Sequence, residues 1–357
     1  MKLALPLARR GMGKTSPNPM VGAVIVKGDR IIGKGYHRRF GGDHAEVDAI
    51  KNASESVSGA TMYVTLEPCC HHGKTPPCTD AIIKNKIRRV VIGTPDPNPR
   101  VNGRGMATLK KNGIEVISGV LEEECRSLNE AFFRHVTTGL PLVTVKFAQT
   151  LDGRIAAASG SSQWISSAAS RRLVHKLRAV NDAVMVGIGT MLADDPELTV
   201  RHLRGRNPIR VILDSRLSIP LEARVLGNQG NAPTIIATTN KADKAKLSRL
   251  KEAGIEVLEI PGDEHGRVDL NQLLVELGKR GISSVLAEGG AGVITALLRR
   301  NLADKIVAIV APKILGKGIE TVGDLNISDV NRSLKLSFTR TYRRDDDLVI
   351  EAKVIKC

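Results

Sequence analysis

Three residues in the first half of the chain, His44, Cys69 and Cys78, could together hold a metal ion. Imidazole and thiolate are good zinc ligands, and a catalytic zinc site uses three protein ligands and leaves a fourth position for water. Glu46 lies two residues after the histidine, where its carboxylate can reach that water without being a ligand. Zinc lowers the pKa of bound water towards about 7. One histidine, two cysteines and a non-ligand glutamate form the set that zinc deaminases use.

The spacing of the two cysteines departs from the general deaminase pattern. That pattern separates its cysteines by two residues, whereas here the residues from Cys70 to Pro77 intervene. The alternative is a closed structural zinc site with Cys70 or His72 as the fourth ligand. Joint ligation by Cys70 and its neighbour Cys69 is awkward because adjacent side chains diverge. An insert with one glycine and two prolines fits a rigid loop over a substrate better, so we expect a catalytic site.

A glycine-rich turn in the second half could bind a phosphate. Glu288-Gly289-Gly290-Ala291-Gly292 follows an apolar run and precedes a helical pattern. Glycines at such a turn let backbone N–H groups and a helix N-terminus approach an anion. The turn is not the G-x-G-x-x-G fingerprint, so a standard dinucleotide-binding fold is not indicated.

The elements that must position these residues alternate between strands and helices. In the first half we expect strands at 21–26, 31–36, 61–66, 89–92 and 114–118, and helices at 44–51, 78–85, 105–112 and 121–138. Gly28-Asp29 is a hairpin turn signal. Gly139-Leu140-Pro141 breaks the last helix, so we place the domain boundary there. Short β-α-β connections predict an α/β sheet with helices on its faces.

The second half continues the alternation. We expect strands at 142–147, 183–186, 209–213, 234–237, 257–260, 284–287 and 306–310, with helices at 168–178, 241–253, 270–279 and 293–299. The segments 334–341 and 348–355 alternate like a closing antiparallel hairpin, with its turn at 343–347.

Composition narrows the class of protein. The 357 residues are 42% hydrophobic and 25% charged, which excludes wholesale disorder. The net charge of +16 is scattered, which favours a basic solvated surface over a nucleic-acid footprint. No apolar run approaches the roughly 20 residues of a membrane span, and the start does not fit a signal peptide. We therefore expect a cytoplasmic protein whose clustered cysteines serve metal binding or catalysis.

The first-half motifs closely resemble the bifunctional riboflavin-biosynthesis deaminase/reductase family. The matching stretches are Ser16-Pro17-Asn18-Pro19-Met20-Val21-Gly22, His44-Ala45-Glu46, and Glu67-Pro68-Cys69 through Gly73-Lys74-Thr75-Pro76-Pro77-Cys78. The long cysteine spacing is what that family shows. The resemblance implies that a pyrimidine and its ribose phosphate contact Asn18, His37, Ala45, His71 and Lys74. Taken alone, His37 could be a satisfied core histidine and Lys74 a solvated lysine.

Motifs of the second half resemble the reductase domain of the same family. They are 146–154, 161–166, 186–190 and 194–201. The resemblance implies a dihydrofolate-reductase-like fold that binds NADPH, after an N-terminal cytidine-deaminase-like three-layer domain. The implied cofactor contacts are Ala148, Trp164, Thr190, Asp194, Ser215, Gly290, Ala291, Gly292, Val293, Ile294, Thr295 and Ala296. The implied contacts of the sugar-phosphate substrate are Ser162, Arg178, Leu198, Arg201 and Glu288. Taken alone, Arg178 could be an exposed helix residue and Trp164 a core residue.

These observations predict two consecutive reactions on one chain. Residues 1–140 would bind Zn²⁺ and hydrolytically deaminate a diaminopyrimidinone that carries a ribosylamino phosphate. Residues 142–357 would then use NADPH to reduce its ribosyl group to ribityl, with Lys146 and Asp194 as candidate proton donors. The expected partners are phosphorylated pyrimidine small molecules and further copies of the chain, without nucleic acid or membrane. The alternatives are a nucleic-acid-editing zinc deaminase and a non-enzymatic module stabilised by zinc, which would leave Glu46 without a role.

Overall fold

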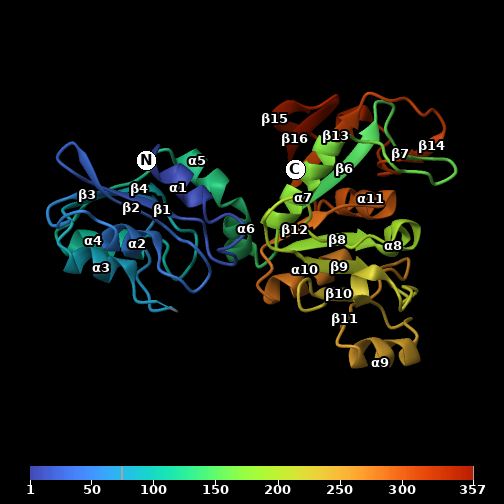
Figure 1. Ribbon diagram of the computed structural model, residues 1–357, viewed down its shortest axis with the longest axis horizontal. Helices are drawn as coiled ribbons and strands as arrows, with labels where there is room; N and C mark the ends of the chain where they lie inside the picture. Colours follow the sequence, from blue (N-terminus) through green and yellow to red (C-terminus); the bar gives the residue numbers. More distant parts are fainter. Residues whose placement is uncertain (74, 357) are drawn as a thin grey trace. The chain divides into compact units, whose positions relative to one another are not determined.

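The computed structural model describes residues 1–73 and 75–356, which form two compact units. Unit 1 is Met1–Leu140, and unit 2 begins at Pro141 (Figure 1). The division falls in the Gly139-Leu140-Pro141 segment, where Gly139 ends a helix in the left-handed conformation (φ 74°). Among the described residues, no helix is long and apolar enough to cross a membrane.

A five-stranded sheet forms the middle of unit 1, in the order β2-β1-β3-β4-β5. Its strands are β1 (Gly22–Lys27), β2 (Arg30–Tyr36), β3 (Thr61–Leu66), β4 (Arg89–Thr94) and β5 (Glu115–Ile117). β1 pairs antiparallel with β2 and β3, and β3, β4 and β5 run parallel. Gly28 takes the positive φ (57°) that the predicted hairpin turn requires. The central strands are buried and apolar, as both faces of the sheet are covered.

Helices lie on both faces of this sheet and complete three layers (Figure 1). The helices of unit 1 are α1 (Ala4–Arg9), α2 (Ala45–Lys51), α3 (Cys78–Lys84), α4 (Arg104–Lys111), α5 (Glu122–Leu128) and α6 (Glu130–Thr138). α2 lies directly on β2: a Cβ at Gly35 would come within 2.2 Å of the Ala49 nitrogen. Only glycine permits this approach, which fixes the start of α2 and hence His44 and Glu46. The predicted α/β three-layer fold of this half is confirmed.

The single helix expected at 121–138 is wrong, because two helices meet at Asn129. Asn129 is 3% exposed, and its side-chain amide makes two hydrogen bonds with the Met20 backbone, one as acceptor and one as donor. Its Oδ1 accepts from Met20 N (2.7 Å) and its Nδ2 donates to Met20 O (2.9 Å). The helical periodicity of the sequence continues through Asn129. The hydrogen bonds to Met20, 109 residues away, hold the backbone of Asn129 out of the helical conformation (φ −116°, ψ 24°).

A nine-stranded sheet spans unit 2, in the order β11-β10-β9-β8-β12-β6-β13-β16-β15. Its strands are β6 (Leu142–Thr150), β8 (Ala183–Gly187), β9 (Ile209–Leu213), β10 (Thr234–Thr238), β11 (Glu256–Glu259), β12 (Ser284–Ala287), β13 (Lys305–Ala311), β15 (Leu336–Arg344) and β16 (Asp347–Val354). The strands from β11 to β13 run parallel, and the hairpin β15–β16 adds antiparallel strands at one edge. The predicted closing hairpin is confirmed. A separate ribbon pairs β7 (Arg154–Ala157) with β14 (Gly318–Glu320) and was not predicted.

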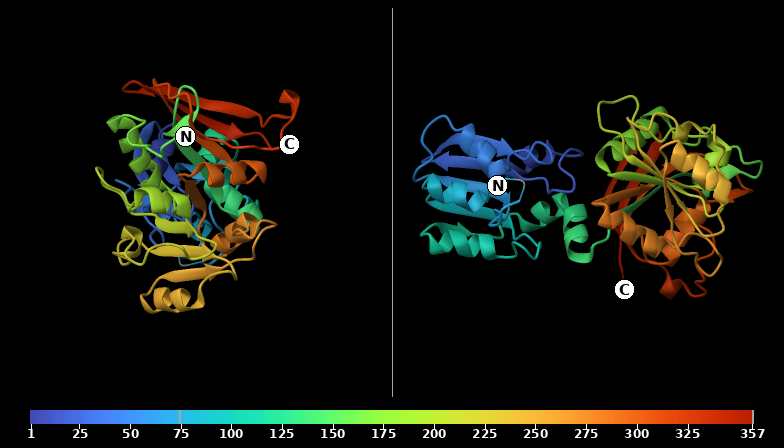
Figure 2. Two further views of the ribbon diagram at one scale, coloured as in Figure 1. Left: turned by 90° about the vertical axis from the view of Figure 1, so that its right-hand side faces the viewer. Right: turned by 90° about the horizontal axis from the view of Figure 1, so that it is seen from below.

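Helices flank this twisted sheet (Figure 2). They are α7 (Ala168–Val180), α8 (Ile188–Asp194), α9 (Lys244–Glu252), α10 (Leu270–Lys279) and α11 (Ala291–Arg299). Ser167 caps α7, because its side chain accepts from Ser170 N. α8 was not predicted, since Gly187 and Gly189 obscure its short pattern. In a sheet of this kind ligands bind beyond the carboxyl ends of the parallel strands.

Candidate functional site

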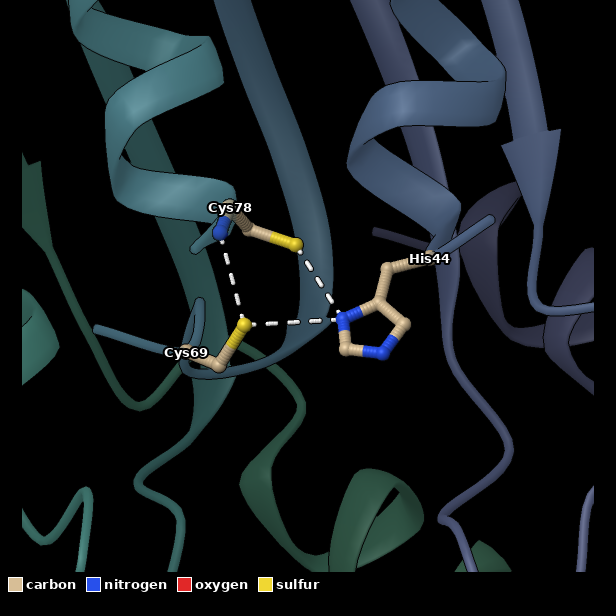
Figure 3. A group of neighbouring side chains, drawn as sticks. All are labelled: His44, Cys69 and Cys78. Atoms are coloured by element: carbon tan, nitrogen blue, oxygen red, sulfur yellow. Dashed lines mark hydrogen bonds between the residues drawn. The ribbon is translucent and has the colours of Figure 1, made fainter. Parts of the chain in front are cut away.

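The three predicted metal ligands converge in unit 1 (Figure 3). His44 occupies the N-cap of α2, Cys69 follows the end of β3, and Cys78 is the first residue of α3. His44 Nδ1 lies 3.2 Å from Cys78 Sγ and 3.5 Å from Cys69 Sγ. The ligand atoms all lie within 4.8 Å of one another, which is the separation of ligands around one metal ion.

The electrostatics of the trio suit a divalent cation. Hydrogen bonds from Cys78 and His44 lower the pKa of Cys69 to about 4, and its sulfur also accepts the Cys78 backbone N–H (3.3 Å). The same hydrogen bond with Cys69 raises the pKa of Cys78, so Cys69 ionises first. A hydrogen bond with Cys69 likewise raises the pKa of His44. Two sulfur ligands, one of them ionised as the Cys69 thiolate, and one imidazole match the donor set of zinc.

Glu46 is held beside the metal ligands in the first turn of α2, and its side chain is 3% exposed. Burial, followed by the negative charge of Cys69, raises its pKa to about 7. It lines a pocket of about 170 Å³ together with His44 and Cys69. A carboxyl group with this pKa can both take up and release a proton near neutral pH.

Three of the predicted pyrimidine contacts line the same pocket: Asn18, His37 and His71. Burial lowers the pKa of His37, which keeps the ring neutral. Its Nδ1–H donates to Asp43 O (2.9 Å), so its Nε2 accepts from Asn18 Nδ2 (3.3 Å). This bond leaves the amide oxygen of Asn18 for a ligand. His71 Nδ1 is buried and has no hydrogen-bond partner among the described residues.

The remaining predicted pyrimidine contacts are placed differently. Ala45 is fully buried in the core of unit 1 and does not line the pocket. Lys74 lies outside the described residues.

Sequence reasoning missed several residues around this pocket. Asp96 and Asn98 follow β4 and line it, and burial raises the pKa of Asp96 to about 6. The signal was available, since Pro95-Asp96-Pro97-Asn98-Pro99 is a rigid polar turn directly after a buried strand. Phe132 of α6 also lines the pocket. Its role could not be predicted, because it depends on how α6 packs.

Buried Glu67 organises the backbone next to Cys69. Its carboxylate accepts the backbone N–H groups of Asp96 (3.2 Å), Gly103 (3.1 Å) and Met106 (3.1 Å). The side chain therefore fastens the start of α4 to the end of β3, two residues before the metal ligand.

Unit 2 contains a cavity of about 1280 Å³ at the carboxyl ends of β6, β8, β9 and β12. This is larger than the range typical of small-molecule sites and offers room for a dinucleotide beside a second ligand. Most of the predicted reductase residues line it: Ala148, Ser162, Trp164, Arg178, Thr190, Asp194, Arg201, Ser215, Glu288, Gly290, Ala291, Gly292, Val293, Ile294 and Ala296. Lys146 lines it as well.

Two predicted residues do not line the cavity. Leu198 is 2% exposed and packs in an apolar cluster with Val186 and Ile212. The hydroxyl of Thr295 bonds with Ala291 O and Gly323 N. Trp164, by contrast, is 62% exposed, with the Arg171 guanidinium 4.5 Å from its ring, so it is not a core residue.

The glycine turn forms the N-terminus of α11, as predicted. Gly289 (φ 152°) and Gly290 (φ 68°) adopt conformations that L-residues rarely take. A Cβ at Gly290 would lie 3.2 Å from the Thr190 hydroxyl oxygen. The turn therefore brings bare backbone to the cavity wall at a helix start, which suits a phosphate.

A buried charge cluster lies at one side of this cavity. Arg178 pairs with Glu288 through Nε (2.5 Å) and Nη2 (2.7 Å), and its Nη1 donates to Thr199 O (3.0 Å). Burial lowers the pKa of Lys146, against the attraction of Glu288. Burial alone would raise the pKa of Glu288, but Arg178 and Lys146 outweigh it and lower that pKa. Arg178 is thus buried in an ion pair and is not an exposed helix residue.

Comparison with known proteins places this geometry in a family. Residues 141–350 match the family model of the RibD C-terminal domain. Residues 1–94 match that of the cytidine and deoxycytidylate deaminase zinc-binding region. The chain belongs to the RibD family.

RibD proteins resemble the chain over nearly its whole length. The riboflavin biosynthesis protein RibD of Aquifex aeolicus is 48% identical, over 98% of this chain and 96% of the relative. That of Escherichia coli is 43% identical over 88% of each chain. The solved structure of Acinetobacter baumannii RibD has a TM-score of 0.91 at 39% identity and covers 99% of this chain and 98% of its own.

A further similar solved structure is that of a protein described by both activities. It is a diaminohydroxyphosphoribosylaminopyrimidine deaminase/5-amino-6-(5-phosphoribosylamino)uracil reductase from Thermotoga maritima, with a TM-score of 0.87, 42% identity, and coverage of 99% of this chain and 97% of its own. The predicted family and the two-part fold are therefore confirmed.

Proposed function

We propose that unit 1 converts 2,5-diamino-6-(5-phosphoribosylamino)pyrimidin-4(3H)-one to 5-amino-6-(5-phosphoribosylamino)uracil, and that unit 2 reduces the ribosyl group of this product to ribityl. The chain is a bifunctional deaminase and reductase of riboflavin biosynthesis. The observation that carries the proposal is the convergence of His44, Cys69 and Cys78 beside the buried carboxyl of Glu46. A closed structural zinc site would give Glu46 no role at the pocket wall.

In the deaminase step, His44, Cys69 and Cys78 would hold Zn²⁺, which supplies a water activated near neutral pH. The oxygen of this water would bond to the amino-bearing carbon, while Glu46 takes up one water proton and delivers it to the pyrimidine ring nitrogen. Glu46 would then pass the second water proton to the amino group, so that the C–N bond breaks, a C=O bond forms and ammonia leaves. Its pKa of about 7 suits both halves of this transfer. The Asn18–His37 pair would present an amide edge to the heterocycle, and His71 Nδ1, which has no partner among the described residues, would offer a further polar contact.

In the reductase step, NADPH would bind along the glycine turn at the N-terminus of α11 and would supply a hydride to C1 of the sugar. The bond from C1 to the ring oxygen breaks, and that oxygen takes up a proton. We favour Lys146 over Asp194 as the source of this proton. Lys146 lies beside Glu288 with its pKa lowered by burial, which eases proton release. Asp194 instead lies 3.5 Å from the amide of Gln163 in an exposed position.

The proposal is tested by incubating the protein with the diaminopyrimidinone substrate, with and without NADPH, and identifying products by mass spectrometry. We expect loss of the amino group in both samples and two added hydrogens only with NADPH. Unchanged substrate with folded, zinc-loaded protein would refute the proposal and favour a nucleic-acid deaminase. Salt-dependent RNA binding would support that alternative.

Substitution of Glu46 tests its assigned role. Glu46→Gln keeps the shape of the side chain and cannot take up the proton. We expect zinc to remain bound and the deamination rate to fall at least about 100-fold, while the deaminated intermediate is still reduced. A variant that deaminates at the wild-type rate would show that the role is misassigned.

Substitution of Arg201 tests the reductase site independently. Its side chain is about half exposed at the cavity, where a guanidinium can bind a phosphate. Arg201→Ala should weaken reduction about 10-fold or more and leave deamination unchanged. Equal loss of both activities would indicate misfolding.

Cytoplasmic location and homo-oligomer formation stay predictions.

A further inference from the structure

We propose that His175 is a positioning residue of the reductase site, which fixes the backbone from which Arg201 reaches the substrate phosphate. The inference rests on the proposed reductase function. His175 lies on α7 (Ala168–Val180), is 7% exposed, and lines the cavity of unit 2. Neither the motifs of the sequence nor the reaction as derived above uses it.

The imidazole is bonded to an irregular segment far along the chain. Its Nδ1 lies 3.2 Å from the backbone nitrogen of Arg201, whose N–H points at it. The same Nδ1 lies 3.1 Å from Thr199 O, a carbonyl that accepts from Arg178 Nη1 (3.0 Å) and does not need a second donor. A proton on Nδ1 would face the Arg201 N–H. The geometry therefore assigns Nδ1 as the acceptor and places the ring proton on Nε2.

The surroundings keep the ring neutral, as this bond requires. The charged and titratable groups that face His175 are Arg178 on its own helix, Arg201 and His202 on the opposite segment, and Glu288, whose carboxylate is paired with Arg178. The His202 ring packs edge-on against it, with centroids 5.3 Å apart. Burial, followed by the charge of Arg178 and then by Arg201 and His202, lowers the pKa of His175 to about 4. At neutral pH the ring is therefore an uncharged hydrogen-bond acceptor beside the Arg178–Glu288 ion pair.

The segment that carries Arg201 needs such an anchor. It lies outside any helix or strand, and Leu198 (φ 55°) and His202 (φ 65°) bracket it with left-handed backbone. Side chains supply its bonds: Asn207 Oδ1 accepts from Val200 N (2.7 Å), and His175 accepts from Arg201 N. The Arg201 guanidinium meanwhile stays 47% exposed at the cavity. A fixed backbone lets this long side chain meet a phosphate with less loss of conformational freedom.

Two variants separate positioning from general packing. His175→Leu keeps a buried side chain and removes the acceptor. His175→Asn places an amide oxygen close to the position of Nδ1 and restores an acceptor that does not titrate. We expect the KM of reduction to rise about 10-fold in the leucine variant, with kcat within about threefold of wild type. The asparagine variant should return KM to within about threefold of wild type.

Two further measurements accompany the kinetics. Hydrogen exchange should be faster in the peptide containing Arg201 in the leucine variant and not in the asparagine variant. The Kd of NADPH, measured by fluorescence, and the deamination rate should be unchanged in both. A leucine variant with wild-type KM and exchange would overturn the proposal, as would equal impairment of both variants. If wild-type protein fails to reduce the deaminated substrate, the proposed function fails instead, and the exchange result still reports on the His175 anchor.

Discussion

Substitution of Gly105 should damage the metal site from outside it. Gly105 lies in the first turn of α4, and a Cβ built there would lie 2.1 Å from Pro68 O, the carbonyl directly before Cys69. Such contacts do not fall below 3.0 Å in real structures, so α4 or the Pro68-Cys69 turn must move by about 1 Å. The helix resists this movement, because Glu67 holds its start through the N–H groups of Gly103 and Met106. The turn that carries the ligand must therefore move.

The consequence for zinc follows from the tolerance of its coordination. Zn–S bonds are about 2.3 Å long and tolerate changes of about 0.2 Å, well below the required shift. We expect Gly105→Ala to weaken zinc binding about 10- to 100-fold. Overpacking of about 1–3 kcal/mol should also lower the unfolding midpoint of unit 1 by about 3–10 °C.

Competition against a chromophoric chelator measures the zinc affinity, and calorimetry measures the midpoint. Gly230→Ala is the matched control, since a Cβ at that exposed residue of unit 2 meets nothing within 4 Å and the residue does not line the cavity. Reduction of the deaminated intermediate by unit 2 should be unaffected in both variants. Wild-type zinc affinity and an unshifted midpoint in Gly105→Ala would refute the packing argument.

Two other predictions concern polar side chains. Asn129→Asp keeps the acceptor for Met20 N and loses the donor to Met20 O, leaving a carboxylate against that carbonyl. It should destabilise unit 1 by about 1–3 kcal/mol and raise the KM of deamination, whereas exposed Asn112→Asp should do neither. The pKa of His175 is about 4 in the folded protein, below the value of 6.5 in the unfolded chain, so between pH 6.5 and 4 only the unfolded chain takes up this proton. The free energy of unfolding of unit 2 should therefore fall by up to about 3 kcal/mol as pH falls from 6.5 to 4. Denaturant unfolding across this pH range should show a smaller loss for His175→Asn, and parallel curves would contradict the neutral-ring assignment.

Much of the fold was predictable, because its elements carry strong local signals. Most of the parallel strands of both units are largely apolar segments bounded by turn residues, and they lie within a few residues of the expected positions. α1, α8 and the β7–β14 ribbon were missed, since short elements bury too few side chains to give a clear period. The break at Asn129 was missed for a different reason: its cause is a bond to Met20 that local periodicity cannot show.

The metal trio was predictable because zinc chemistry restricts the residue types and the strand-to-helix junctions bring them together. Spacing alone left open whether Cys70 or His72 completes a closed site. The structure places neither within the group of His44, Cys69 and Cys78. The reductase residues were predictable only through resemblance. Arginines, serines and glycines are common on any surface, and the cavity assembles them from segments between β6 and α11.

Three of the residues to which sequence reasoning gave no role share one physical function. Asn129, Glu67 and His175 are buried polar side chains whose partners are backbone groups of irregular segments next to a site. Such segments lack a helix or sheet ladder, yet their N–H and C=O groups must still be bonded once buried. A side chain from a distant element supplies the bond and thereby fixes the segment. Because the partner is a backbone group, which every residue type carries, no pair of residue types in the sequence predicts this hydrogen bond. Functional consequences of substituting these residues should therefore appear at the neighbouring site, although none of them has to touch a substrate.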